Sequence, residues 1–323
     1  MIARIQQIST LSLLAFASMW ATVMGWRGAY GWAMAGALLI VFGYAIFLGI
    51  EFILLARFGA EEGAVSPAAG QLLRAWFGEV VRAPLVFCWR HPFRSQAVPD
   101  HDFAGVSSGR TGVVFIHGFV CNRGFWNPWL RRFRAMRIPF VAVNLEPPFG
   151  SIDEYADLIE LAVQKLHNAT GCAPVVVAHS MGGLAARAWL TRFQGAERVR
   201  RIITIASPHH GTWLGRFAVT TNGEQMHSGS QWLKSLARAE RPSDLARFTC
   251  FYGHCDNIVF PVRTATLPGA DNRHVSATAH IHMAFRPEVM QEVLRWASAD
   301  PANSGADPMR VESCVGRSES RSP

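Results

Sequence analysis

Residues 174–183 read PVVVAHSMGG and carry the strongest structural signal in the sequence. A run of valines is followed by a serine between small residues, and then by a segment of small residues with helical spacing. The pattern is typical of a nucleophile elbow, a tight strand-to-helix turn that places a serine hydroxyl above a sheet. Ala178 stands where the pattern usually has its first glycine, and alanine is still small enough for the turn. We therefore predict that Ser180 is a nucleophile.

Short β-branched runs alternate with stretches of helical periodicity on both sides of this elbow. The runs lie at 111–118, 139–145, 201–208 and 247–253, and the helical stretches lie at 125–136, 155–166 and 184–189. Such alternation predicts an α/β fold, with a mostly parallel sheet that is covered by helices on both faces. In these sheets the functional residues gather at the carboxyl ends of the strands.

Two backbone N–H groups are expected to form an oxyanion hole beside Ser180. One belongs to Met181, directly after the nucleophile, and the other to Phe119, after the first strand of the domain. We expect the neighbouring His117 to stabilise its turn rather than to touch a substrate.

The chain from about residue 111 to residue 296 resembles the bacterial triacylglycerol lipases of the α/β-hydrolase superfamily. The matching segments are FIHGF at 115–119, VVVAHSMGGLAARAWL at 175–190 and IASPHHGT at 205–212, and two further stretches, at 226–236 and 251–261, are also similar. The resemblance implies the α/β-hydrolase fold, hydrolysis of ester bonds in acylglycerols or smaller esters, and no cofactor.

In this fold the acid and then the histidine follow the serine along the chain. Asp256 comes after the run at 247–253 and is the predicted acid. Asp244 and Asp271 are the alternatives; the first precedes that run and the second lies among turn residues, so we interpret both as surface charges.

The lipase-like pattern places the histidine in a short loop before the last helix, and His280 fits this position best. His282 is the alternative, because a residue two positions away in an extended stretch points the same way. His274 is the third candidate.

A metal site is the less favoured interpretation of the remaining histidines. His209, His210, His254 and Cys255 do not follow the spacing of a compact zinc motif. The six cysteines also show no CxxC pair, so we predict free thiols, although Cys250 and Cys255 are near enough in the sequence to pair.

Two long apolar runs, at about 10–26 and 29–55, predict two transmembrane helices that form a hairpin over residues 1–58. The secreted lipases lack such a hairpin. Trp26, Tyr30 and Trp32 lie at its turn, where an aromatic belt is expected. A cleaved signal peptide is the alternative for the first run, but a second run follows it at once.

The net charge of +8 comes almost wholly from arginine, and no nucleic-acid-binding motif accompanies it. We therefore favour a membrane surface as the partner of these charges and expect no nucleic acid. Arginines flank the hairpin on both outer sides, which favours a cytoplasmic catalytic domain at a bacterial inner membrane.

Three further segments complete the predicted organisation. Residues 59–108 form a juxtamembrane linker whose amphipathic part, 71–89, either lies on the membrane or packs on the catalytic domain at 109–298. The connection at 213–247 is either a lid over an acyl-chain groove or a pair of packed helices. Residues 299–323 are expected to be disordered.

The sequence thus predicts a membrane-anchored serine hydrolase of the lipase or esterase kind, in which Ser180, Asp256 and His280 act through an acyl-enzyme. An acyltransferase or a thioesterase would use the same three residues. A non-catalytic membrane scaffold that keeps the fold is the alternative from another class of protein.

Overall fold

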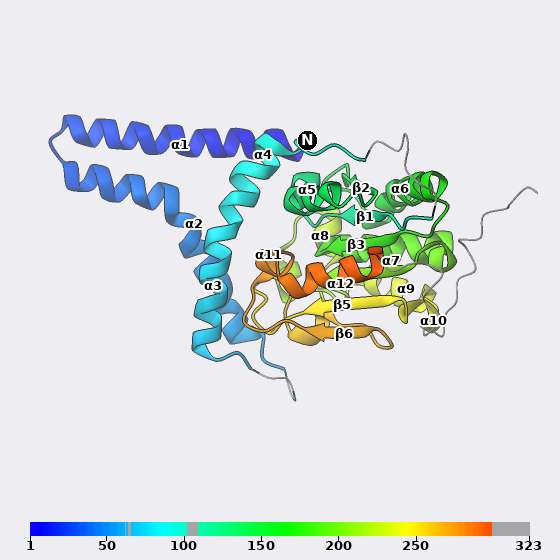
Figure 1. The fold of residues 1–323 in the computed structure, drawn as a ribbon. Coiled ribbons are helices and arrows are strands. Elements are labelled where there is room, and N and C mark those ends of the chain that lie inside the picture. The colour runs from blue at the N-terminus through cyan, green and yellow to red at the C-terminus, as the bar shows by residue number, and fades with distance from the viewer. Residues whose placement is uncertain (62, 64–65, 102–108, 299–323) are drawn as a thin grey trace, which may run out of the picture.

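A computed structural model of the chain describes residues 1–61, 63, 66–101 and 109–298. The predicted disordered tail at 299–323 lies outside the described residues. Figure 1 shows a long helical hairpin that projects from an α/β domain. A further helix runs between the hairpin and the domain.

The domain is built on a parallel sheet with the strand order β2-β1-β3-β4-β5-β6. The strands are β1 (Val113–Ile116), β2 (Phe140–Val143), β3 (Val175–His179), β4 (Arg201–Ile205), β5 (Phe248–Tyr252) and β6 (Asp271–His274). The predicted α/β class is confirmed. Strand β6 was not predicted, and the prediction that Asp271 lies in a turn is wrong. This edge strand is polar and only half-buried, and it lacks the apolar run of the inner strands.

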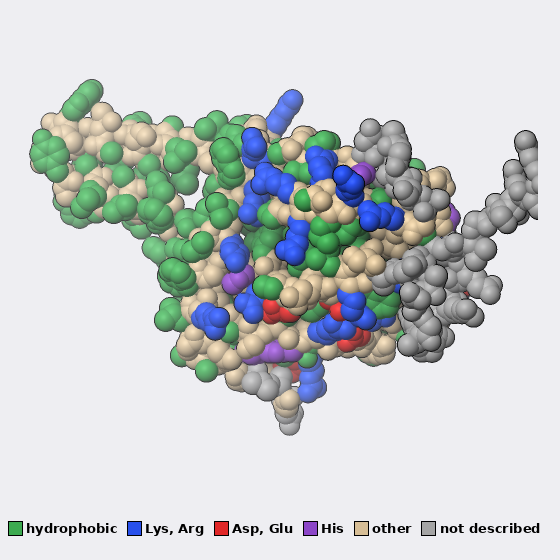
Figure 2. Space-filling view, in the orientation of Figure 1, with side chains coloured by type: hydrophobic (Ala, Val, Ile, Leu, Met, Phe, Trp, Pro, Cys, Tyr) green, Lys and Arg blue, Asp and Glu red, His purple; other side chains and the backbone are tan. Residues whose placement is uncertain are grey.

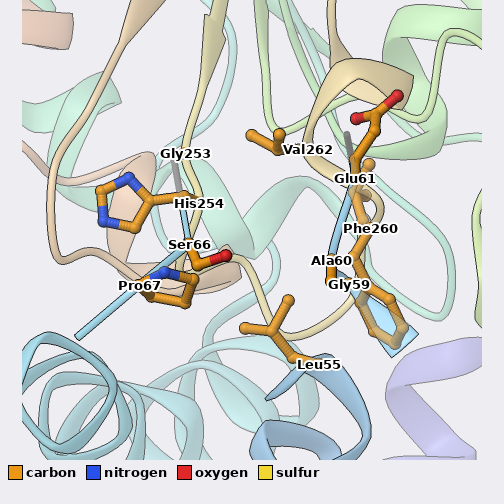
Figure 3. Close-up of a pocket in the computed structure, with 11 residues that line it drawn as sticks. Leu55, Gly59, Ala60, Glu61, Ser66, Pro67, Gly253, His254, Phe260 and Val262 are labelled. Carbon is orange, nitrogen blue, oxygen red and sulfur yellow. The ribbon is translucent and has the colours of Figure 1, made fainter. Parts of the chain in front are cut away.

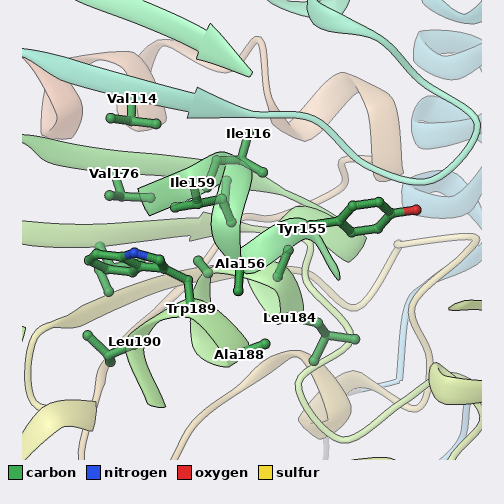
Figure 4. Close-up of a cluster of buried hydrophobic side chains, with 14 of the residues drawn as sticks. Val114, Ile116, Tyr155, Ala156, Ile159, Val176, Leu184, Ala188, Trp189 and Leu190 are labelled. Atoms are coloured by element: carbon green, nitrogen blue, oxygen red, sulfur yellow. The ribbon is translucent and has the colours of Figure 1, made fainter. Parts of the chain in front are cut away.

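Helices cover both faces of the sheet, and alternate residues of each strand contribute to the two cores. Val114 and Val176 face the core beneath α6 (Tyr155–Thr170) and α7 (Met181–Phe193), where Trp189 is fully buried (Figure 4). The opposite core contains a cluster of aromatic side chains among aliphatic ones and lies beneath α5 (Asn127–Ala135) and α12 (Pro287–Ser298).

The remaining helical turns of the domain are short. They are η2 (Arg123–Trp126), η3 (Ile152–Glu154), η4 (Gly195–Arg198), η5 (Trp213–Phe217), α8 (Thr221–Gln225), α9 (Gln231–Ala239), α10 (Pro242–Leu245), η6 (Val262–Ala265) and α11 (His280–Met283). The connection at 213–247 therefore consists of four short helices. Leu233 of α9 packs into the core beside α7, and the buried Arg187 of α7 forms an ion pair with Glu240 directly after α9.

The hairpin consists of α1 (Ile2–Trp26) and α2 (Tyr30–Phe58). The two helices pack closely, because Gly36 leaves room for the Trp20 ring, whose Nε1 donates to the carbonyl oxygen of Trp32 at 2.9 Å. Both are long and apolar enough to span a membrane. Figure 2 shows that hydrophobic side chains cover the projecting part of the hairpin.

Both ends of the hairpin contact the α/β domain. Ile2 and Gln6 are buried at the start of α1, and Phe52 and Leu55 are buried near the end of α2. The latter two belong to a small core that also includes Phe260 of the domain. The last turns of α2 are thus packed against the domain rather than exposed like the middle of the helix.

The segment after the hairpin forms α3 (Ala69–Pro84), a π-helical stretch η1 (Leu85–Arg90) and α4 (His91–Arg94). Ala75, Glu79 and Ala83 recur every four residues and are buried on one face of α3. This helix therefore packs on the protein through a face of small residues, with a single buried carboxylate among them.

Candidate active site

Ser180 lies at a sharp turn between β3 and α7. Its backbone has φ 55° and ψ −128°, a conformation that side-chain-bearing residues rarely adopt and that functional turns retain. The turn needs small neighbours, since a Cβ on Gly182 would lie 2.7 Å from the carbonyl oxygen of His117. The residue is 7% exposed, so Ser180 is buried.

A continuous chain of hydrogen bonds joins Ser180, His280 and Asp256. Ser180 Oγ lies 2.9 Å from His280 Nε2. Nδ1 of the same ring lies 3.0 and 3.1 Å from the two carboxylate oxygens of Asp256. The three residues come from loops after β3, β5 and β6, so the parallel sheet gathers them at one edge.

The loop after β5 holds the Asp256 carboxylate in a fixed orientation. Its Oδ1 accepts the backbone N–H groups of Ile258 and Val259, each at 2.9 Å. These bonds leave the carboxylate directed at the His280 ring. With its Nδ1–H donated to Asp256, the imidazole has Nε2 free to accept the proton of Ser180.

The charges around the imidazole favour its protonated form. Burial lowers the pKa of His280, but the Asp256 carboxylate, with smaller contributions from Glu79 and Glu51, outweighs burial and raises the pKa above its usual value of 6.5. The site is therefore suited to hold a proton on this ring.

The loop after β1 lies against the nucleophile. A Cβ on Gly118 would come within 2.8 Å of the Cβ of Ser180, so the close approach requires glycine. The N–H groups of Phe119 and Met181 donate to no acceptor within the described part of the chain. Met181 is the first residue of α7, where backbone N–H groups lack a partner inside the helix.

The side chain of His117 stabilises this loop. Its Nε2 accepts the N–H of Leu145 at 3.0 Å, and its Nδ1 donates to the carbonyl oxygen of Gly118 at 2.9 Å. Burial lowers the pKa of His117 to about 4, so the ring stays neutral. The structure thus agrees with the expectation that this imidazole stabilises its turn.

Comparison with protein families identifies the family of the chain. Residues 113–311 match the model of the alpha/beta hydrolase family. The chain belongs to this family. Comparison with curated proteins found no match.

Solved structures of lipases share the fold of this hydrolase. The mature form of a Bacillus licheniformis lipase is 17% identical, with a TM-score of 0.51 over 57% of this chain and 92% of the lipase. Aspergillus fumigatus lipase B is 18% identical, with a TM-score of 0.53 over 59% of this chain and 53% of that lipase. The hydrolase thus spans about half the length of the second lipase, and at these identities the similarity concerns the fold.

The other acidic and histidine candidates of the hydrolase lie in different contacts. Asp244 bonds Arg241 at 3.0 Å, and Asp271 bonds Arg273 at 2.8 Å. His282 faces α3, where a Cβ on Gly78 would lie 2.5 Å from its Nδ1.

His274 is also occupied elsewhere, because its Nε2 pairs with Nδ1 of His254 at 2.6 Å. Within the described residues of the hydrolase, no three His, Cys, Asp or Glu side chains come together in a way that could hold a metal ion. Cys250 and Cys255 form no disulfide, and each is a buried thiol.

Three residues near His280 were not predicted from the sequence. Glu79 of α3 and Glu51 of α2 are buried beside the acid and base loops of the hydrolase, and Asn257 links Glu51 to the histidine. Glu51 interrupts a long apolar run, and Glu79 lies on a helix face of small residues. A carboxylate is unusual at either position. Nothing in the sequence indicated what they contact.

A small pocket with a cavity volume of about 10 Å³, room for little more than one water molecule, lies behind the acid loop of the hydrolase (Figure 3). Leu55 of α2 and His254 and Phe260 of the domain help to line it. None of the three hydrogen-bonded residues of the candidate site lines this pocket, so the reacting ester cannot occupy it.

Proposed function

We propose that the chain is a membrane-anchored serine hydrolase that cleaves carboxylic ester bonds through an acyl-enzyme. The observation that carries the proposal is the hydrogen-bond chain from Ser180 through His280 to Asp256, at 2.9 and 3.0 Å. A neutral imidazole that is oriented by a carboxylate and touches a serine hydroxyl is the arrangement that makes serine nucleophilic.

In this mechanism Ser180 attacks the ester carbonyl while His280 takes its proton. Asp256 stabilises the imidazolium that forms. The N–H groups of Phe119 and Met181 bind the negative oxygen of the tetrahedral intermediate. His280 then protonates the leaving alcohol, and an acyl-enzyme remains on Ser180. Water deprotonated by His280 releases the acid and restores the serine.

The surroundings of the nucleophile favour an apolar acyl group. The ring of Phe119 contacts that of Phe149 edge to face, with 6.0 Å between their centroids, and Phe149 is exposed. These rings offer an apolar surface beside Ser180, which favours an ester with a hydrocarbon chain over a charged one.

Labelling by a fluorophosphonate tests the nucleophile. We expect wild-type protein to take the label and to hydrolyse p-nitrophenyl esters, whereas Ser180→Ala takes none. Ser207→Ala is the matched control, because this buried hydroxyl follows the neighbouring strand β4 and has no hydrogen-bond partner in the described chain. Equal labelling of wild type and Ser180→Ala would overturn the assignment. A series of esters of graded length measures the acyl preference.

The exposure of the hairpin supports the proposed membrane anchor at 1–58. Only 6% of the most apolar window of α1 is buried and only 22% of that of α2. The core helix of a water-soluble protein would be mostly buried. Large apolar side chains exposed to water over two such helices would be unfavourable, whereas a bilayer accommodates them.

A second apolar surface continues from the hairpin along α3, η1 and α4, and we call it the apolar stripe. Its exposed members recur every four residues: Leu73, Phe77, Val81, Leu85, Trp89 and Phe93. Four arginines directly follow members of the stripe: Arg74, Arg82, Arg90 and Arg94. An apolar face bordered by arginine is typical of a helix that lies in the surface of an anionic membrane. Figure 1 shows α3 transverse to α1, the orientation required if α1 crosses the bilayer.

Fluorophore labelling tests this placement in the full-length protein. In a Cys88→Ser/Cys314→Ser background, Phe77→Cys in the stripe and Leu161→Cys on α6 provide matched sites, because the native residues are 63% and 64% exposed. We expect lipid-borne quenchers in vesicles of anionic lipid to quench a fluorophore at 77 but not at 161. Equal quenching at the two sites would contradict the placement of α3 in the membrane surface.

A further inference from the structure

The N-terminal helices contact the loops that carry the candidate active site. One contact comes from α1, where Gln6 Nε2 donates to the carbonyl oxygen of Val120 at 3.0 Å, next to Phe119. The other two come from buried carboxylates on α3 and α2, and both lead to His280.

Glu79 of α3 binds the backbone directly after the histidine. Its Oε1 accepts the N–H of Ile281 at 2.9 Å, and its Oε2 accepts the N–H of His282 at 3.0 Å. Both oxygens are used, and the residue is 1% exposed. The carboxylate thus forms a two-point clamp on the first turn of α11, which begins at His280.

Glu51 near the end of α2 reaches the histidine through one intermediate residue. Its Oε2 accepts a hydrogen bond from Asn257 Nδ2 at 2.6 Å. Oδ1 of the same amide accepts the backbone N–H of His280 at 3.2 Å. Because Asn257 directly follows Asp256, this contact fixes the acid loop and the base loop together.

Carboxylates are a costly way to dock a helix on a domain. Burial of a carboxylate is unfavourable unless hydrogen bonds compensate, and an apolar side chain of similar size often stabilises a fold at least as well. Around Glu79, small apolar residues already provide the packing of α3. What a carboxylate adds is direction, because two acceptor oxygens fix the N–H groups of one helical turn in orientation.

We propose that Glu79 directly, and Glu51 through Asn257, are positioning residues that hold His280 against Ser180 and Asp256. The N-terminal helices would then position a catalytic side chain as well as anchor the domain. The inference rests on the proposed serine-hydrolase function. A displacement of about 1 Å at a reacting group can lower turnover by about a hundredfold, so loss of these contacts acts mainly on kcat.

Glu79→Gln in the full-length protein tests the clamp. The amide keeps the size of the side chain but replaces one acceptor by a donor that faces a backbone N–H. We expect kcat for a p-nitrophenyl ester to fall by about a hundredfold while KM stays unchanged. Burial raises the pKa of Glu79 to about 7, so assays at about pH 8 keep the wild-type carboxylate largely ionised. Glu197→Gln, at an exposed carboxylate of η4, is the control and should leave kcat unchanged.

A pair of substitutions tests the contact through Asn257. Asn257→Asp places a carboxylate against that of Glu51 and should lower kcat by about a hundredfold. Adding Glu51→Gln exchanges the donor and the acceptor of this hydrogen bond, while the carbonyl-type oxygen that faces the His280 N–H is kept. We expect the double variant to recover most of the lost kcat, which a merely destabilised fold would not do.

The outcomes separate this inference from the function on which it rests. If wild type takes the fluorophosphonate label but Glu79→Gln and Asn257→Asp keep wild-type kcat, the positioning role is overturned and the hydrolase stands. A loss in Asn257→Asp without recovery in the double variant would also overturn it. If wild type neither takes the label nor hydrolyses esters, both proposals fail.

Discussion

Ser180→Ala and His280→Ala are each expected to lower kcat by about a millionfold. The double variant is expected to lower kcat by the same factor and no further. The reason is the hydrogen bond of 2.9 Å between Oγ and Nε2, which makes the two groups one functional unit. Without the imidazole the serine keeps its proton, and without the serine the imidazole has no nucleophile to activate. The measurement is kcat of the three purified variants on one p-nitrophenyl ester.

Losses that multiply would contradict this prediction. They would mean that the serine and the histidine contribute to turnover independently, so that some other group accepts the Ser180 proton. His282→Ala is the control, because this ring faces α3, and we expect a much smaller loss of kcat than in His280→Ala.

Asp256→Asn is expected to lower kcat by about ten-thousandfold with the fold intact. The amide can donate to Nδ1 of His280 and so favour the tautomer whose Nε2 carries a proton. That nitrogen can then no longer accept the proton of Ser180. Asp244→Asn and Asp271→Asn are matched controls, because both carboxylates pair with arginines in other contacts. A comparable loss in either control, or a small loss in Asp256→Asn, would refute the assignment of the acid.

The pH dependence of the residual activity provides a second measure of the same substitution. His280 must be neutral to accept a proton, so kcat/KM rises with pH through its pKa. Because nearby carboxylates raise this pKa above its usual value of 6.5, the acid limb of the wild-type profile should lie above that pH. Asp256→Asn removes the largest of these charges and should move the limb to lower pH. A limb that moves upward would contradict the origin of the shift.

Local sequence was sufficient to predict the α/β architecture and the positions of the inner strands along the chain. The valine run before Ser180 and the small residues around it specify a strand, a tight turn and a helix, because these preferences act between neighbouring residues. The same holds for the apolar hairpin, whose length and lack of charge are local properties. Chain order then limited the acid and the histidine to a few candidates near the carboxyl end. The catalytic roles of Ser180, Asp256 and His280 stay predictions.

Which of these side chains contact one another depends on the packing of the whole domain. The choice of His280 over His282 depends on the first turn of α11, which directs one ring towards Ser180 and the other towards α3. The polar edge strand β6 exists because β5 pairs with it, and its own residues carry no strand pattern. Glu51 and Glu79 lie 206 and 202 residues before their partners Asn257 and Ile281, so no local pattern can reveal those contacts. Hydrogen bonds between such distant residues form only once the chain has packed, which is why the link between the N-terminal helices and His280 appears in the structure and not in the sequence.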